Sequence, residues 1–179
     1  MQAATLKAPI AERINFRLLF FSAVMLAVIG YPIYIYLDSI LSGGIKELPG
    51  GVKKVDLKAM SSFVFDQYVG TIDDVPEKWR ALHGQKVVLE GEMVPPSLSA
   101  RGGTGRFELV YSVQQCCFSG VPQIQHFVQC TVVDGQEVPY VSGLVRVAGT
   151  LTVDVTRDPE TNAITGVYHL RVEGFEPVY

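Results

Sequence analysis

The hydrophobic and polar positions of this chain form two patterns, one near its start and one after Gly84. Near the start, residues 18–37 (LLFFSAVMLAVIGYPIYIYL) carry no charged side chain and lie between Arg17 and Asp38. At about 1.5 Å of rise per residue, a helix of this length is about 30 Å long, which matches the hydrocarbon core of a bilayer. The run therefore predicts a transmembrane helix over residues 17–37, with lipid as the partner of that segment.

A cleaved signal peptide is the alternative interpretation of this run. The apolar core of a signal peptide is normally about 7–15 residues long, and a cleavage site of small residues follows it. The run here is longer than that, and Ser42-Gly43-Gly44 matches such a site only weakly. We therefore favour an uncleaved membrane anchor.

The charges that flank the run predict its orientation. Arg13 and Arg17 lie close to its start, whereas Asp38 is the first charged residue after it. More distant lysines follow the run at positions 46, 53, 54 and 58. Because positive charges close to a membrane helix favour the cytoplasmic side, we expect a cytoplasmic N-terminus and a periplasmic or otherwise extracytoplasmic C-terminal domain.

After Gly84, apolar and polar positions alternate with a period of two, which is typical of half-buried β-strands. Gly91 and Gly149 interrupt two of these segments, and we expect a bulge or a sharp coil at Gly149. One compact helix is expected before the strands, over residues 71–84. The pattern predicts five strands, at residues 86–94, 106–118, 124–133, 144–155 and 166–178.

Five strands after one short helix favour a mainly β fold, namely a small five-stranded OB-like β-barrel, because closure removes exposed strand edges. An antiparallel sandwich is the alternative. Glycine-rich turns before the helix indicate a flexible connection. The predicted organisation is an N-terminal tail (1–16), the transmembrane helix (17–37), a stalk and docking segment (38–71) and the OB-like domain (72–179).

Four stretches of the predicted domain occur in a familiar order: GQKVVLEGEMVPP, FELVYSVQQCCFSGVPQIQHFVQC, VRVAGTL and YHLRVEGFEP. In this order they resemble an uncharacterised family of bacterial membrane-anchored envelope proteins with an OB-like domain. The resemblance covers residues 72–178. The chain differs from the family in Glu92, where an aromatic residue is usual, in its single turn proline and in its doubled cysteine. The residues that match are Gly84, Lys86, Val88, Gly91, Met93 and Pro95, followed by Cys116 or Cys117 with Pro122.

The resemblance implies an OB-like fold and a place in the bacterial envelope, and it implies no activity. A doubled cysteine at a similar place also resembles OB-like domains that accompany some bacterial membrane permeases. The net charge of −3 argues against a nucleic-acid partner, which normally requires a basic patch. The sequence contains no P-loop, dinucleotide fingerprint or G-x-S-x-G motif.

The segment QQCCFSGVPQIQHFVQC holds all three cysteines and one of the three histidines of the chain. A structural zinc site needs four ligands within about 2.0–2.3 Å of one point. On a regular hairpin, Cys117 and His126 become diagonal neighbours, Cys116 points to the opposite face, and Cys130 opposes Tyr111. Cys116, Cys117 and His126 are therefore an incomplete set of metal ligands, and we keep them as candidates for a metal or thiol-redox site.

A disulfide between Cys130 and either Cys116 or Cys117 is a further candidate, because an extracytoplasmic compartment favours oxidation. Bridged cysteines need Cα atoms within about 7 Å of each other, and a symmetric hairpin keeps Cys130 farther than that from either partner. The remaining interpretation is that the cysteines are small buried apolar residues. Arg101, in the loop 97–105, and Arg106, which follows it, are the candidate contacts to a ligand or partner, because OB barrels bind ligands near their loops.

We therefore expect a single-pass, membrane-anchored, extracytoplasmic OB-like binding module or accessory subunit of a larger membrane complex. It is expected to be non-catalytic, to need no cofactor and to have a membrane protein as partner. The alternative is a metal-binding or thiol-redox envelope protein that uses Cys116, Cys117 and His126.

Overall fold

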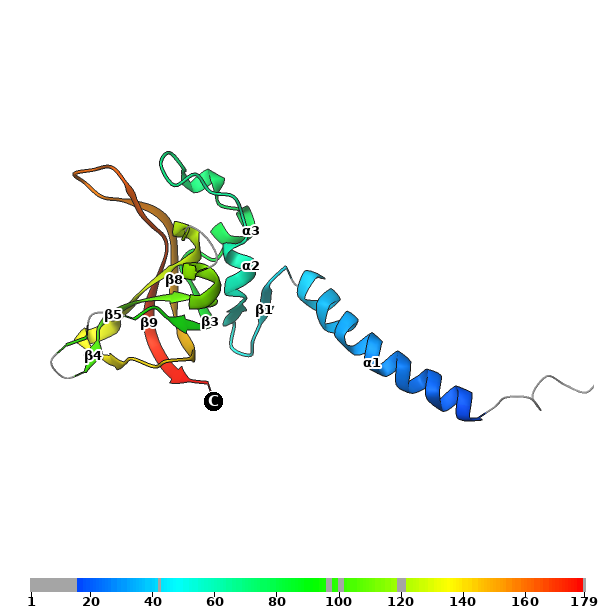
Figure 1. The fold of residues 1–179 in the computed structure, drawn as a ribbon. Helices are drawn as coiled ribbons and strands as arrows, with labels where there is room; N and C mark the ends of the chain where they lie inside the picture. Colours follow the sequence, from blue (N-terminus) through cyan, green and yellow to red (C-terminus); the bar gives the residue numbers. More distant parts are fainter. Residues whose placement is uncertain (1–15, 42, 96–97, 100–101, 119–121, 179) are drawn as a thin grey trace, which may run out of the picture. The chain divides into compact units, whose positions relative to one another are not determined.

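The structure is a computed structural model that describes residues 16–41, 43–95, 98–99, 102–118 and 122–178. The chain divides into two compact units, Met1–Ser42 and Gly43–Tyr179. In the first unit, helix α1 (Phe16–Leu41) continues through Pro32 (Figure 1). Most of its described side chains are exposed, and the large apolar ones among them are Leu19, Phe20, Phe21, Val24, Met25, Leu26, Val28, Ile29, Tyr31, Ile33 and Tyr34.

The structure corrects the prediction of a transmembrane helix over residues 17–37. Among the residues that the structure describes, no helix is both long and apolar enough to cross a membrane. The side chains of Leu18 and of residues 35–37 lie outside the described ones.

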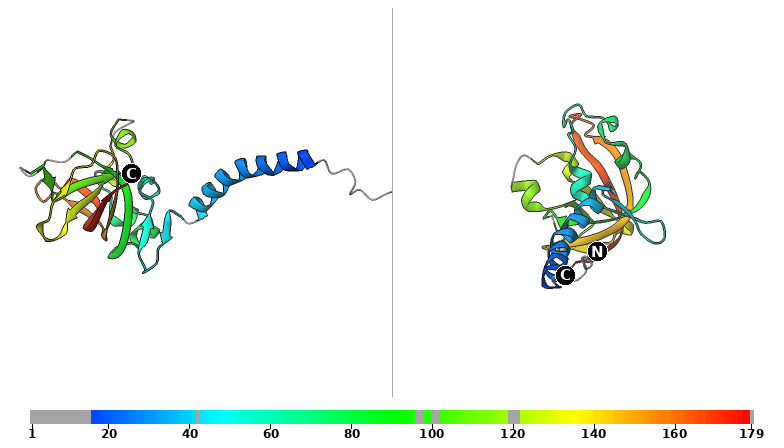
Figure 2. Two further views of the ribbon diagram at one scale, coloured as in Figure 1. Left: turned by 90° about the horizontal axis from the view of Figure 1, so that it is seen from below. Right: turned by 90° about the vertical axis from the view of Figure 1, so that its right-hand side faces the viewer.

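The second unit is mainly β, as predicted, and is built on a mixed sheet of seven strands. The β2–β3 and β6–β9 pairs are parallel and the other pairs are antiparallel, and β3 also pairs with β8. The long strands β8 and β9 run side by side in every view (Figure 1, Figure 2). In spatial order the strands are β1 (Ile45–Glu47), β2 (Lys53–Val55), β3 (Gln85–Met93), β5 (Arg106–Val110), β6 (Val128–Val132), β9 (Ile164–Pro177) and β8 (Leu144–Arg157).

Short elements complete the second unit. Strands β4 (Gly103–Thr104) and β7 (Val138–Pro139) form a separate two-stranded sheet. The helices α2 (Leu57–Ser61) and α3 (Glu77–Arg80) lie beside the large sheet (Figure 1). Asp56 caps α2, because its carboxylate accepts hydrogen bonds from the Lys58 and Ala59 amides. Single turns of 3₁₀ helix occur at Ile72–Asp74, Ile124–His126 and Val133–Gly135, and a π-helical turn occurs at Gln114–Phe118.

The structure replaces the predicted five-stranded OB-like β-barrel with a mixed sheet of seven strands and a second sheet of two. The additional strands of the large sheet, β1 and β2, come from the segment predicted as a stalk, residues 38–71. From Gly43 onward this segment belongs to the second compact unit, and it contributes Val55, Leu57, Met60 and Phe65 to the core. The predicted single helix over residues 71–84 is two short helices, because the extended backbone at Val75 and Pro76 separates them.

The core lies between the inner face of the sheet and the helices. Alternate residues of the strands point inward, as shown by the burial pattern of β3 and by Val145 and Val147 of β8. Trp79 and Tyr168 are the largest fully buried side chains, and the Tyr168 hydroxyl donates a hydrogen bond to the Met60 carbonyl at 3.2 Å. The predicted irregularity at Gly149 is confirmed, because the β8–β9 register shifts between Ala148 and Gly149.

Candidate functional site

Strands β5 and β6 present a polar row of side chains to solvent. Arg106 and Glu108 are exposed, while Phe107 between them is buried, because neighbouring residues of a strand point to opposite faces. The register places Arg106 opposite Thr131 and Glu108 opposite Gln129. Two cross-strand polar pairs therefore lie next to each other on the outer face.

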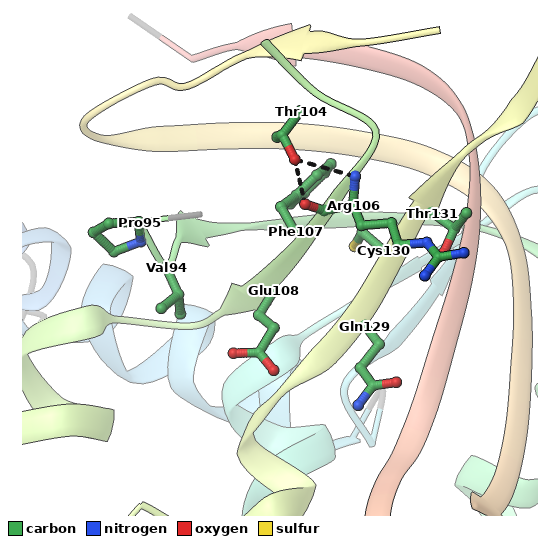
Figure 3. A pocket seen from close by; sticks show the side chains of 9 residues that line it. All are labelled: Val94, Pro95, Thr104, Arg106, Phe107, Glu108, Gln129, Cys130 and Thr131. Carbon is green, nitrogen blue, oxygen red and sulfur yellow. Dashed lines mark hydrogen bonds between the residues drawn. The ribbon is translucent and has the colours of Figure 1, made fainter. Parts of the chain in front are cut away.

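A pocket of about 530 Å³ opens over these pairs (Figure 3). Its polar lining consists of Thr104, Arg106, Glu108, Gln129 and Thr131, and Val94, Pro95, Phe107 and Cys130 complete it. A smaller pocket of about 170 Å³ shares Glu108 and Gln129 with it and extends to Ile124, Phe127 and Thr165. Because the two pockets share two residues, we treat them as one feature, the β5–β6 groove.

Hydrogen bonds hold the groove in shape. The Thr104 hydroxyl donates to the Arg106 carbonyl at 2.5 Å and accepts from the Arg106 amide at 3.2 Å (Figure 3). This side chain therefore covers the backbone of β5 at Arg106, where another strand would otherwise pair. At the other end, the Gln129 amide nitrogen donates to the Thr165 carbonyl at 2.6 Å, which fixes the orientation of Gln129.

Charged side chains elsewhere on the sheet are paired. Glu90 accepts from Lys54 at 2.7 Å and from Arg146 at 2.8 Å, and the hydrogen bond from Lys54 is the main cause of the lowered pKa of Glu90. Arg146 also binds Glu176, and Lys86 binds Glu173. In the groove the situation differs, because neither Arg106 nor Glu108 has an ion-pair partner among the residues that the structure describes.

Cys130 lies on the inner side of β6, opposite Phe107, and not opposite Tyr111 as the predicted hairpin had it. It is a buried free thiol in the structure, so the disulfide predicted for it with Cys116 or Cys117 is not present. Burial, and to a lesser degree the charge of Glu108, raises the pKa of the Cys130 thiol. A thiol with a raised pKa is a poor nucleophile and metal ligand.

The predicted strand over residues 106–118 ends as a strand at Val110, and the chain then turns away from the sheet. The Val113 amide donates to the Glu92 carboxylate at 2.7 Å, and Cys116 follows as a buried residue of the π-helical turn. The side chain of Cys117 lies outside the described residues. The Cys116–Cys117 pair is therefore on a helical turn and not on a strand edge.

His126 belongs to a 3₁₀ turn before β6 and not to a strand. Its ring meets Tyr111 edge to face, with 6.2 Å between the ring centroids, and its Nδ1 is buried without a hydrogen-bond partner. Burial lowers the pKa of the His126 imidazole. Among the described residues, no group of three His, Cys, Asp or Glu side chains could hold a metal ion. The metal set of Cys116, Cys117 and His126 stays a prediction.

Of the residues predicted to contact a ligand, Arg106 lines the groove, and Arg101 lies outside the described residues. Glu108 and Gln129 were not among the predicted site residues, because an alternation of polar and apolar residues predicts only half-buried strands. The alternation does place Arg106 and Glu108 on one face. Only the register of β5 with β6 brings Gln129 and Thr131 to them.

The fold and the groove define a mainly β protein with a polar groove on its sheet. No family model and no curated protein sequence matches the chain. Among solved structures, a DUF3299 family protein from Pseudomonas aeruginosa is similar, at 23% identity over 56% of this chain and with a TM-score of 0.43. The chain covers 65% of that protein. We draw no conclusion about function from a likeness of this degree.

Proposed function

We propose that this chain is a non-catalytic binding module that holds a protein partner in the β5–β6 groove and contacts lipid through α1. The groove carries the proposal: a polar pocket of about 530 Å³ in which Arg106 and Glu108 face solvent without an ion-pair partner in the described part of the chain. Hydrogen bonds to charged groups contribute about 1.5–3 kcal/mol each, so a partner that supplies the missing charges gains affinity and specificity.

Photocrosslinking in the native cell tests this function. With a photoreactive amino acid at Thr131, on the groove, we expect a discrete adduct between the chain and its partner. The same amino acid at Thr152 is the matched control, since Thr152 is also an exposed threonine in a strand of this sheet and lies outside the groove lining. In the Thr131 variant, Arg106→Glu should reduce the adduct about tenfold. Equal adducts from both positions, or none from Thr131, would contradict the proposal.

The exposed side chains of α1 support the second part of the proposal. Leu19, Phe20 and Phe21 are between 53% and 71% exposed. An exposed apolar surface of this extent is typical of a site that contacts a membrane or another protein. We propose contact with lipid and make no claim that α1 crosses the bilayer. The cytoplasmic location of the N-terminus and the extracytoplasmic location of the second unit stay predictions.

Vesicle flotation measures this contact. The full chain is expected to float with phosphatidylcholine vesicles, and Phe20→Asp with Phe21→Asp should reduce the bound fraction about tenfold, because each charge opposes transfer into an apolar phase. The control is Val64→Asp with Val69→Asp, at side chains of the second unit that are 95% and 70% exposed. If the control variant loses binding equally, or the α1 variant keeps it, lipid contact through α1 is wrong.

A further inference from the structure

We infer that the ligand of the β5–β6 groove is an extended peptide segment that carries one acidic and one basic side chain two residues apart. This inference rests on the proposed binding function and names the chemistry that the groove recognises.

The spacing of the two charges in the groove sets the spacing in the ligand. Arg106 and Glu108 are both exposed and lie two residues apart on the same face of β5. With a rise of about 3.3 Å per residue, positions i and i+2 of a strand are about 6.6 Å apart. A ligand in extended conformation alongside β5 has the same repeat. Its side chains i and i+2 therefore meet Arg106 and Glu108 in register.

A second arginine, Arg171, lies beside the basic end of the groove and outside its lining. Thr131 lies opposite Arg106 on one side and opposite Arg171 of β9 on the other, so its hydroxyl stands between two arginines. Neighbouring strands are about 4.8 Å apart, so Arg106 and Arg171 lie about 9.6 Å apart across β6, and two long guanidinium side chains can converge on a carboxylate over this distance. Arg171 has no ion-pair contact within 4.0 Å among the described residues, although its charge, after that of Lys86, helps to lower the pKa of Glu173.

The acidic end of the groove offers acceptors. Glu108 supplies a carboxylate, and Gln129 can supply its amide oxygen, because one N–H of its amide group donates to the Thr165 carbonyl and so fixes the orientation of the group. An ammonium or guanidinium group of the ligand donates hydrogen bonds and accepts none, so it matches this end. The two ends thus select opposite charges.

This arrangement favours a peptide of mixed charge over a polyanion. A nucleic acid that placed one phosphate at Arg106 would bring the next charges close to Glu108, which repels them. β3 pairs with β5 only at Leu109 and Val110, and the Thr104 hydroxyl covers the β5 backbone at Arg106, where β3 is not paired. A ligand strand therefore cannot pair with the backbone there, and recognition acts through side chains. The inference therefore predicts a charge pattern in the ligand.

Three labelled peptides of equal length, capped at both ends, test the charge pattern. They differ only in two positions: Glu-x-Lys, Glu-x-Glu and Lys-x-Lys. Fluorescence anisotropy with the full chain in phosphatidylcholine nanodiscs is expected to give an affinity for Glu-x-Lys about tenfold above that for either other peptide. Added salt should weaken this binding, because the groove is exposed. Equal affinity for all three peptides, or tighter binding of a single-stranded oligonucleotide, overturns the inference.

A variant that changes which peptide binds most tightly distinguishes specific recognition of charge from non-specific binding. Arg106→Glu should transfer the preference to Lys-x-Lys, whereas Lys58→Glu, at an exposed lysine of α2, should leave the order of the peptides unchanged. If the variants do not change the order while the Thr131 crosslink in cells persists and still depends on Arg106, this inference fails and the proposed binding function stands. If that crosslink is also absent, both fail.

Discussion

Gly149→Ala is expected to lower the free energy of unfolding of the second unit by about 3 kcal/mol. A Cβ at this position would lie 2.1 Å from the Arg171 carbonyl oxygen and 3.2 Å from the Cα of Val172. Both atoms belong to the backbone of β9, so rotation of a side chain cannot relieve the overlap and the two longest strands must separate. Urea unfolding checks the value, followed by the fluorescence of Trp79, the single tryptophan of the chain.

Gly174→Ala is the matched control, since Gly174 lies in the same pair of strands. A Cβ there would meet the Ala148 methyl group at 3.5 Å, which is an ordinary contact. We expect a change of no more than about 0.5 kcal/mol. Equal losses in the two variants would show that steric overlap with β9 is not the reason for Gly149. The carbonyl that the extra methyl group would displace belongs to Arg171, so the register shift at Gly149 also positions the arginine that lies beside the groove.

The long strands could be predicted from the sequence. The segments expected at residues 86–94, 144–155 and 166–178 are β3, β8 and β9, and their ends differ from the prediction by at most two residues. Buried positions alternate with less buried ones over eight residues in β3, eleven in β8 and six in β9. Such a pattern depends on local sequence alone, and a sheet with one buried face enforces it.

The segment between β5 and β6 could not be predicted in the same way. Its alternation continues past Val110, but contacts with distant residues pull the chain away from the sheet. The Val113 amide binds Glu92, and the buried Gln125 donates to the Phe63 carbonyl at 3.1 Å. These partners are 21 and 62 residues away in the sequence. For this reason Cys117 and His126 lie in helical turns and not on the regular hairpin from which their neighbourhood was predicted.

The beginning of the second unit was misread for a different reason. Strands β1 and β2 have three residues each, which is too short to show a period. The glycines around them indicated flexibility, but the φ angles of Gly44, Gly50 and Gly51 are 83°, 88° and 75°, a region that favours glycine. These glycines make defined tight turns. Glycine content alone does not separate a tight turn from a linker.

The candidate site lies between these cases. Arg106 could be proposed from its place after a loop, and its alternation with Glu108 places both on one face. That Arg106 and Glu108 lack ion-pair partners among the described residues depends on the tertiary structure. Elsewhere on the sheet, Lys54 and Arg146 bind Glu90, and Lys86 binds Glu173. The sequence alone cannot assign these pairs.

Trp79→Ala is expected to lower the free energy of unfolding by about 4 kcal/mol, because it removes a buried aromatic side chain and leaves a cavity. Trp79 is 1% exposed. Its ring closes over the start of the second unit, since a Cβ at Gly44 would lie 3.1 Å from the ring. The Gly44 carbonyl in turn accepts a hydrogen bond from the Asp56 amide at 2.8 Å. Without the ring, we expect the segment 43–47 to open more readily than the rest of the sheet.

Two measurements separate the cavity from this local effect. Because the variant has lost the only tryptophan, circular dichroism must follow its unfolding, and hydrogen exchange must follow the Asp56 amide. We expect exchange at Asp56 to accelerate more than exchange at Val147 of β8, since Val147 pairs with β3 and β9 and does not depend on Trp79 for this pairing. Trp79→Phe keeps an aromatic ring and should lose about half as much stability. Unchanged protection of the Asp56 amide in Trp79→Ala would show that the ring does not hold the start of the folded unit, and Gly44 would then need another explanation for its close packing.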